Sequence, residues 1–331
     1  MKILYLKTTD PSLKHINDFL HDTLLVGLRN RFGNSVVDYP GAWYMYKDEC
    51  EKKRVEQKSF WGKGFTLYNI LRGYDKIDRE NIQSKIKNNY FDYIIYGSIR
   101  GKNLFYEDVL KSKSKKAFID TSDDPNIDNE KLNKGLYFKR ELYQKYKNIF
   151  PINFAIPAEK IIKNTKNETK FILSPLIPGK IDTYQYDEET KYFEMYQNSL
   201  FSLTYRKTGW DCLRHYEILA SGSIPLFLDL EKCPEDTCTT LPKNDLRKIY
   251  KEFSWLLSFY NPFKVLKKRY RNLNSYKNYL VRFFSNLPSS DELLKKYPIV
   301  QEHRNNLLEF TKKNLTSEML AENLVNTLKK Y

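Results

Sequence analysis

The sequence KTGWDCLRHYEILASGSIPLF, residues 207–227, has the pattern of a strand end, a tight loop, a helix, a glycine turn and a second strand. Gly209 permits a sharp turn before a helix that we expect from Cys212 to Ser221. Gly222 suits the left-handed residue that ends many helices, and Ile224–Leu228 then enters a sheet. A helix that connects two strands in this way predicts a parallel sheet.

The same stretch has the residues that a nucleoside diphosphate needs. The start of the helix offers free N–H groups and the positive end of a dipole, which together accept a pyrophosphate. Glu217 follows Arg214 by three residues, so both side chains can face one side of the helix, and the carboxylate can accept hydrogen bonds from two ribose hydroxyls. The residues that we predict to bind such a nucleotide are Arg206, Lys207, Gly209, Arg214, Glu217, Ser221 and Gly222.

The stretch resembles the donor-binding motif of GT-B-fold glycosyltransferases, and in particular the exostosin-like pattern. The residues that carry the resemblance are Arg214, Glu217, Leu219, Gly222, Ile224 and Pro225, and a Gly-Trp-Asp-Cys-x-Arg-His-Tyr-Glu core also occurs in a set of glycosyltransferase-like proteins. The resemblance implies a nucleotide sugar as co-substrate, with no metal and no other cofactor.

The sequence departs from this family at one position. Many retaining GT-B enzymes have a second Glu eight residues before the ribose-binding one, whereas this chain has Gly209 there and Asp211 as the nearest acid. The sequence therefore leaves inversion and retention open, and it also leaves open a non-catalytic sugar-binding scaffold. An inverting enzyme needs a general base, for which Asp22 is our first candidate and Asp120 our second, with His21 and Asp123 as further candidates.

Alternating strands and helices extend to both sides of the motif. Met1–Lys7 and Ser35–Tyr39 are predicted strands on either side of a helix that starts after a break at Asp10-Pro11-Ser12. The remaining predicted elements are strands at Tyr93–Tyr96, Ala117–Ile119, Lys170–Ser174 and Leu200–Thr204, a helix at Thr190–Asn198, and a last helix from about Thr316 to Lys329 with Thr316 or Ser317 as its cap.

These elements predict an α/β fold of two facing Rossmann-like domains, the GT-B architecture, with a helical C-terminal region. The prolines of Phe150–Pro157 suggest the boundary, so we predict an acceptor-side domain at 1–160, a nucleotide-sugar-binding domain at 161–300 and a helical segment at 301–331. A short loop, Gly62-Lys63-Gly64-Phe65-Thr66, is a weaker candidate for holding a phosphate or the acceptor.

Composition limits the class of partner. The 331 residues have a net charge of +15, which favours an anionic partner such as a nucleotide, a nucleic acid or an anionic lipid. The four cysteines form no CxxC pair, so we expect no zinc site, and they fit a reducing cytoplasm. The basic and aromatic stretch Leu246–Phe284 predicts peripheral binding to an anionic membrane on its cytoplasmic face.

We therefore predict a glycosyltransferase that moves a sugar from a nucleotide-sugar donor to a glycan or lipid-linked acceptor. The alternative from another class is a basic nucleic-acid-binding protein. Because the chain contains no known nucleic-acid motif and its basic residues are spread widely, nucleic acid is not expected as a partner.

Overall fold

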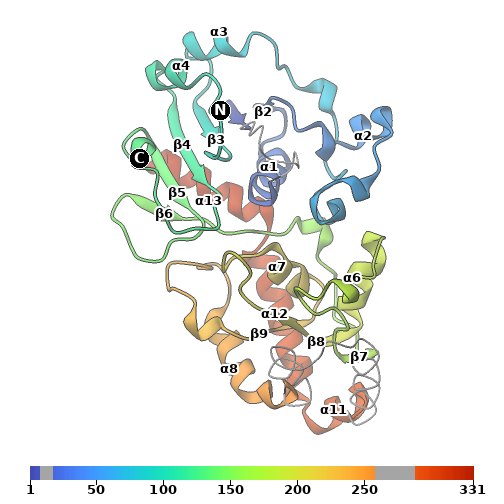
Figure 1. Cartoon of the computed structure of the whole chain (residues 1–331). Coiled ribbons are helices and arrows are strands. Elements are labelled where there is room, and N and C mark those ends of the chain that lie inside the picture. The colour runs from blue at the N-terminus through green and yellow to red at the C-terminus, as the bar shows by residue number, and fades with distance from the viewer. Residues whose placement is uncertain (8–17, 258–287) are drawn as a thin grey trace.

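The computed structural model describes residues 1–7, 18–257 and 288–331, which form two α/β parts, one above the other in Figure 1. The break at Asp10-Pro11-Ser12 lies outside these residues, as does most of the predicted membrane-binding stretch. Within the described residues, none of the helices is both long enough and apolar enough to cross a membrane.

The first part contains a six-stranded parallel sheet with the strand order β2-β1-β3-β4-β5-β6. The strands are β1 (Ile3–Leu6), β2 (Val36–Tyr39), β3 (Tyr93–Tyr96), β4 (Lys115–Asp120), β5 (Leu136–Lys139) and β6 (Ile149–Pro151). Every side chain of β1 is fully buried, because β1 lies inside the sheet and both of its faces are covered. The four strands predicted in this half are confirmed, whereas β5 and β6 were not predicted.

Helices surround this sheet. They are α1 (Phe19–Phe32), α2 (Lys47–Lys53), α3 (Ile82–Lys87), α4 (Tyr106–Lys111) and α5 (Asn129–Leu132). The Asp18 carboxylate caps α1 by accepting hydrogen bonds from the backbone N–H groups of Leu20 and His21 at 3.1 and 3.2 Å.

The second part contains a three-stranded parallel sheet in the order β7-β8-β9. Its strands are β7 (Phe171–Leu173), β8 (Ser199–Thr204) and β9 (Ile224–Phe227), and its helices are α6 (Glu189–Gln197), α7 (Leu213–Ala220), α8 (Lys243–Phe253), α11 (Ser290–Lys296) and α12 (Ile299–Asn314). Helix α7 connects β8 to β9, as the sequence predicted. Helices α6 and α7 lie at the end of this part that faces the first part (Figure 1).

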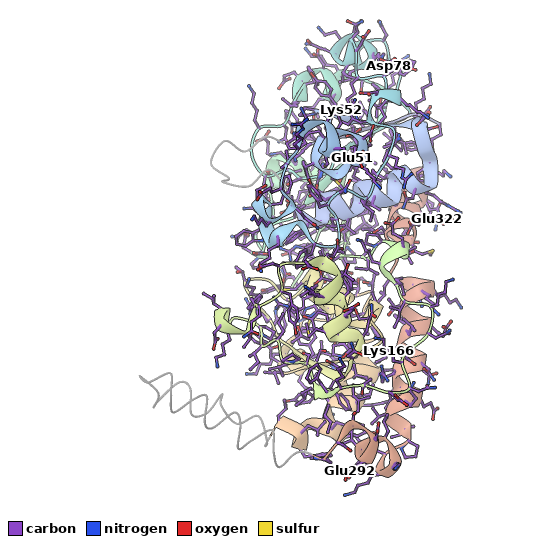
Figure 2. The ribbon with its side chains drawn as sticks, turned by 90° about the vertical axis from the view of Figure 1, so that its right-hand side faces the viewer. Glu51, Lys52, Asp78, Lys166, Glu292 and Glu322 are labelled. Atoms are coloured by element: carbon purple, nitrogen blue, oxygen red, sulfur yellow. The ribbon has the colours of Figure 1, made fainter. Side chains whose placement is uncertain are left out.

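The last helix, α13 (Ser317–Lys330), returns to the first part and packs against α1 and β4 (Figure 1). A Cβ atom on Gly27 of α1 would lie 1.8 Å from the carbonyl oxygen of Ser317, so the close approach of the two helices requires glycine there. In Figure 2, Glu322 of α13 lies beside the first part and Glu292 lies at the far end of the second. The predicted cap is confirmed, because Thr316 Oγ1 accepts from the backbone N–H of Met319 at 3.2 Å.

The predicted fold class is confirmed by the two parallel sheets, their covering helices and the helical C-terminal region. The domain boundaries at 160 and 300 stay predictions. The chain crosses between the two parts near Ile156 and again near Leu315. Two backbone hydrogen bonds of 2.9 Å join these crossing segments, so the two connections support each other.

Candidate functional site

A cavity of about 620 Å³ opens between the two parts. The first part contributes residues 58–63, Phe65, Asp123 and Arg140, among others. The second part contributes Leu176, three tyrosines and most of the stretch 207–217. That stretch follows the carboxyl end of β8, which is where open α/β sheets bind ligands.

Glu217 of α7 lines this cavity, with 7 % of its surface exposed. Thr66 Oγ1 donates to Oε1 of Glu217 at 2.5 Å, and the Tyr192 hydroxyl donates to Oε2 at 2.6 Å. Burial raises the pKa of Glu217, and the two hydroxyl hydrogen bonds only partly oppose that rise. Each carboxylate oxygen therefore already accepts from one hydroxyl, the arrangement expected for a ribose diol.

Arg214 lines the cavity one turn before Glu217. Its Nη2 donates to the Tyr184 hydroxyl at 2.9 Å, and its buried Nε has no hydrogen-bond partner among the described residues. Burial opposes the charge, but the neighbouring tyrosines and Glu217 outweigh it and keep the pKa of Arg214 above its ordinary value. A charged guanidinium with an unused buried donor suits an anionic ligand.

Gly209 lines the cavity, and its role in holding the pyrophosphate stays a prediction. Its backbone is not left-handed; instead, the Glu141 carboxylate lies so close that a Cβ on Gly209 would meet it. Glu141, which is fully buried, accepts the backbone N–H groups of Trp210 and Asp211, both at 3.0 Å. Since Glu141 uses these two N–H groups, a phosphate would have to rely on Arg214, Lys207 and the remaining loop.

The other predicted donor residues divide into two groups. Lys207 lines the cavity, whereas Arg206 lies over the Trp210 ring, with 5.1 Å between its guanidinium carbon and the ring centroid. Ser221 and Gly222 lie at the opposite end of α7 and are not among the described residues that line the cavity. The Ser221 hydroxyl donates to the carbonyl of Glu217 at 2.8 Å, and Gly222 has a φ of +68°. Both residues therefore end the helix.

Asp22 is buried, and among the described residues two side chains contact its carboxylate. The Tyr44 hydroxyl donates to its Oδ1 at 2.5 Å, and Nδ1 of His21 lies 2.9 Å from the same oxygen. Asp22 is not among the described residues that line the large cavity. Its assignment as the general base stays a prediction.

Asp120 lies at the end of β4 within a buried polar network. Its carboxylate accepts from Tyr137 at 2.7 Å, from the fully buried Lys139 at 2.9 Å and from Ser122 at 2.6 Å. Burial raises the pKa of Asp120, but Lys139 and the hydrogen bonds outweigh burial, and the net direction is downward. The catalytic role of Asp120 also stays a prediction. Asp123, three residues further along the chain, pairs with Arg140 and lines the cavity.

Several residues of the site were missed from the sequence. Tyr184, Tyr186 and Tyr192 surround Arg214 and Glu217, and Glu141 supports the loop before α7. The tyrosines occur in one aromatic-rich stretch, but spacing alone does not separate core rings from cavity rings. Among the described residues, no group of three or more His, Cys, Asp or Glu side chains is placed to hold a metal ion.

Comparisons with known proteins give structural likenesses only. No protein-family model matches the chain, and no curated protein matches it. One similar solved structure is an alpha-glucosyltransferase in complex with UDP, with a TM-score of 0.45, 10 % identity and coverage of 99 % of this chain and 100 % of that chain. Another is an alpha-glucosyltransferase in complex with UDP and a 13-mer DNA containing an HMU base, with a TM-score of 0.44, 10 % identity and coverage of 99 % of both chains.

One prediction is corrected here. The sequence predicted a glycan or lipid-linked acceptor and no nucleic-acid partner. This prediction is contradicted by the second structure, which was solved with DNA. A wide spread of basic residues does not exclude a nucleic-acid partner.

Proposed function

We propose that the chain is a glycosyltransferase that uses a nucleoside-diphosphate sugar, with its donor in the cavity between the two parts. The observation that carries the proposal is Glu217, whose two oxygens accept from two separate hydroxyls beside a partly unpaired Arg214. A carboxylate and a buried cation in one cleft match the diol and the diphosphate of such a donor.

In this proposal each residue has one role. Glu217 accepts hydrogen bonds from the two ribose hydroxyls, and Arg214 and Lys207 contact the phosphates. Tyr184 positions Arg214, whose Nη2 donates to its hydroxyl, and Tyr184 and Tyr186 both line the cavity. No metal and no other cofactor takes part.

The acid from the first part assists the acceptor hydroxyl if the reaction inverts. Asp22 remains the first candidate and Asp120 the second. Asp123 is tested beside them because it lines the cavity. A carboxylate there would take the proton from the hydroxyl as the new glycosidic bond forms and the nucleoside diphosphate leaves.

We infer that the acceptor is anionic. The support is the net charge of +15, together with Lys58 among the cavity-lining residues. A hydroxyl-bearing nucleic acid is the first acceptor to test, and a hydroxymethylated DNA duplex is a suitable probe.

A thermal-shift screen tests the proposal. UDP or GDP should raise the melting temperature more than the matching nucleoside does, because only the diphosphate reaches Arg214. If no nucleoside diphosphate stabilises the protein while plain DNA does so in a strongly salt-dependent way, the chain is a nucleic-acid-binding protein and the proposal is wrong.

A further inference from the structure

The segment Phe60–Thr66 of the first part has an unusual backbone. Gly62, Lys63, Gly64 and Thr66 all have positive φ, with values of 63°, 57°, 67° and 75°. Glycine adopts this region readily, but Thr66 is β-branched, and its Cβ crowds the backbone there. Such a conformation persists only where surrounding contacts hold it.

The contacts that hold the segment come from the second part. The backbone N–H of Thr66 donates to Oε1 of Glu189 at 2.9 Å. Lys63 Nζ donates to the carbonyl of Tyr186 at 2.6 Å and to Oδ1 of Asp187 at 2.7 Å. The strained segment is therefore held against the second part by three hydrogen bonds to residues 186–189.

A fourth contact reaches the proposed donor site itself. The Thr66 side chain is fully buried, and its hydroxyl donates to Oε1 of Glu217 at 2.5 Å. The ring centroid of the adjacent Phe65 lies 5.3 Å from that of Tyr192, whose hydroxyl occupies Oε2. Thr66 thus holds the position that a ribose hydroxyl would take on Glu217.

We propose that residues 60–66 form a latch that occupies Glu217 while the donor site is empty, and that a donor ribose displaces the Thr66 hydroxyl from this carboxylate. The inference rests on the proposed function, because it takes Glu217 as the ribose-binding group. Release of the latch relaxes the strained backbone at Thr66, which offsets part of the hydrogen bonding that is lost. The Thr66 hydroxyl and the donor ribose therefore compete for Glu217, and donor binding shifts the equilibrium toward the released latch.

Isothermal calorimetry with UDP and GDP tests the latch on Thr66→Val, which keeps the β-branch and removes the hydroxyl. Because one competing hydrogen bond is lost, the variant should bind the nucleotide about three- to tenfold more tightly than wild type. Thr66→Ser keeps the hydroxyl and should bind no more tightly than wild type.

A second variant acts outside the buried site. Asp187→Asn weakens the exposed ion pair between Lys63 and Asp187. It should also tighten nucleotide binding, by a smaller factor than Thr66→Val. Asp182→Asn removes the same charge from a neighbouring exposed acid and should leave the affinity unchanged.

The outcomes separate the two proposals. Equal or weaker nucleotide binding by folded Thr66→Val, against a wild type that binds, overturns the latch and leaves the donor site standing. If Thr66→Val does not fold, an affinity for Asp187→Asn equal to that of Asp182→Asn overturns it instead. A wild type that binds no nucleoside diphosphate overturns the proposed function, and the latch with it.

Discussion

A Cβ atom on Gly209 would lie 2.5 Å from Oε1 of Glu141, although the two residues belong to different parts of the molecule. Glu141 follows β5, and Gly209 lies in the loop between β8 and α7. The loop before α7 is therefore held in place by a carboxylate from the first part, and its glycine makes room for that carboxylate.

This contact predicts the effect of Gly209→Ala. The added methyl group should displace Glu141 and destabilise the protein by about 1–3 kcal/mol, as overpacking of a buried site does. Urea denaturation measures this loss. In a Glu141→Ala background the same substitution should cost clearly less, because the clashing carboxylate is gone. An equal cost in both backgrounds would show that the contact is unimportant.

His215 predicts a pH dependence of stability. Burial lowers the pKa of His215 to about 4, and the ring lies 2.9 Å from both Thr204 Oγ1 and the carbonyl of Trp210. The folded-state pKa is below that of the unfolded chain, near 6.5. Stability from this residue is therefore present above pH 6.5 and is lost as pH falls toward 4.

The measurement compares wild type with His215→Gln. Between pH 7 and pH 5 the wild type should lose about 2 kcal/mol relative to the variant. The comparison is needed because burial raises the pKa of Glu217, Asp211 and Glu141, which acts in the opposite direction. Parallel pH profiles for the two proteins would contradict the prediction.

Arg214→Ala should discriminate between ligands. Affinity for UDP or GDP should fall about tenfold, because one charge-assisted contact is lost, whereas affinity for the bare nucleoside should change less than twofold. Lys207→Ala, at the more exposed position, should give a smaller loss for the diphosphate. Calorimetry with both ligands checks this, and an equal loss for both ligands would place Arg214 away from the phosphates.

The general base is tested with Asp22→Asn, Asp120→Asn and Asp123→Asn. If Asp22 is the base, its variant loses at least tenfold in kcat and keeps nucleotide affinity within about twofold. Asp120→Asn also weakens the pair with the buried Lys139 and should lower stability, so unfolding is measured beside turnover. If Asp22→Asn and Asp120→Asn keep their turnover and only Asp123→Asn loses it, the general base is Asp123, which lines the cavity.

The sequence predicted those elements whose pattern is local. Strand, loop and helix around Glu217 follow from Gly209, Gly222 and the apolar spacing between them. The strands β5 and β6 were missed for local reasons: β5 ends on a charged residue, Lys139, which is buried against Asp120, and β6 ends on Pro151, whose stretch suggested a domain boundary. Helix α13 was predicted as a helix, but its apolar face does not specify that α1 is its partner.

The same limit applies to the site. Glu217 was found from its spacing to Arg214, whereas its partners Thr66 and Tyr192 lie 151 and 25 positions away in the chain. Periodicity does not report contacts over such separations. Asp22 and Asp120 are acids near an apolar helix face and a strand end, and no sequence pattern indicates the Tyr44 and Lys139 partners that satisfy them.

The most direct test of the donor site is the nucleoside-diphosphate affinity of Glu217→Ala, measured by calorimetry beside wild type. Two hydrogen bonds to a charged acceptor are lost, so the account predicts affinity about 10–100-fold weaker in a protein that stays folded. Unchanged affinity in folded Glu217→Ala would contradict the donor site and the glycosyltransferase function proposed from it.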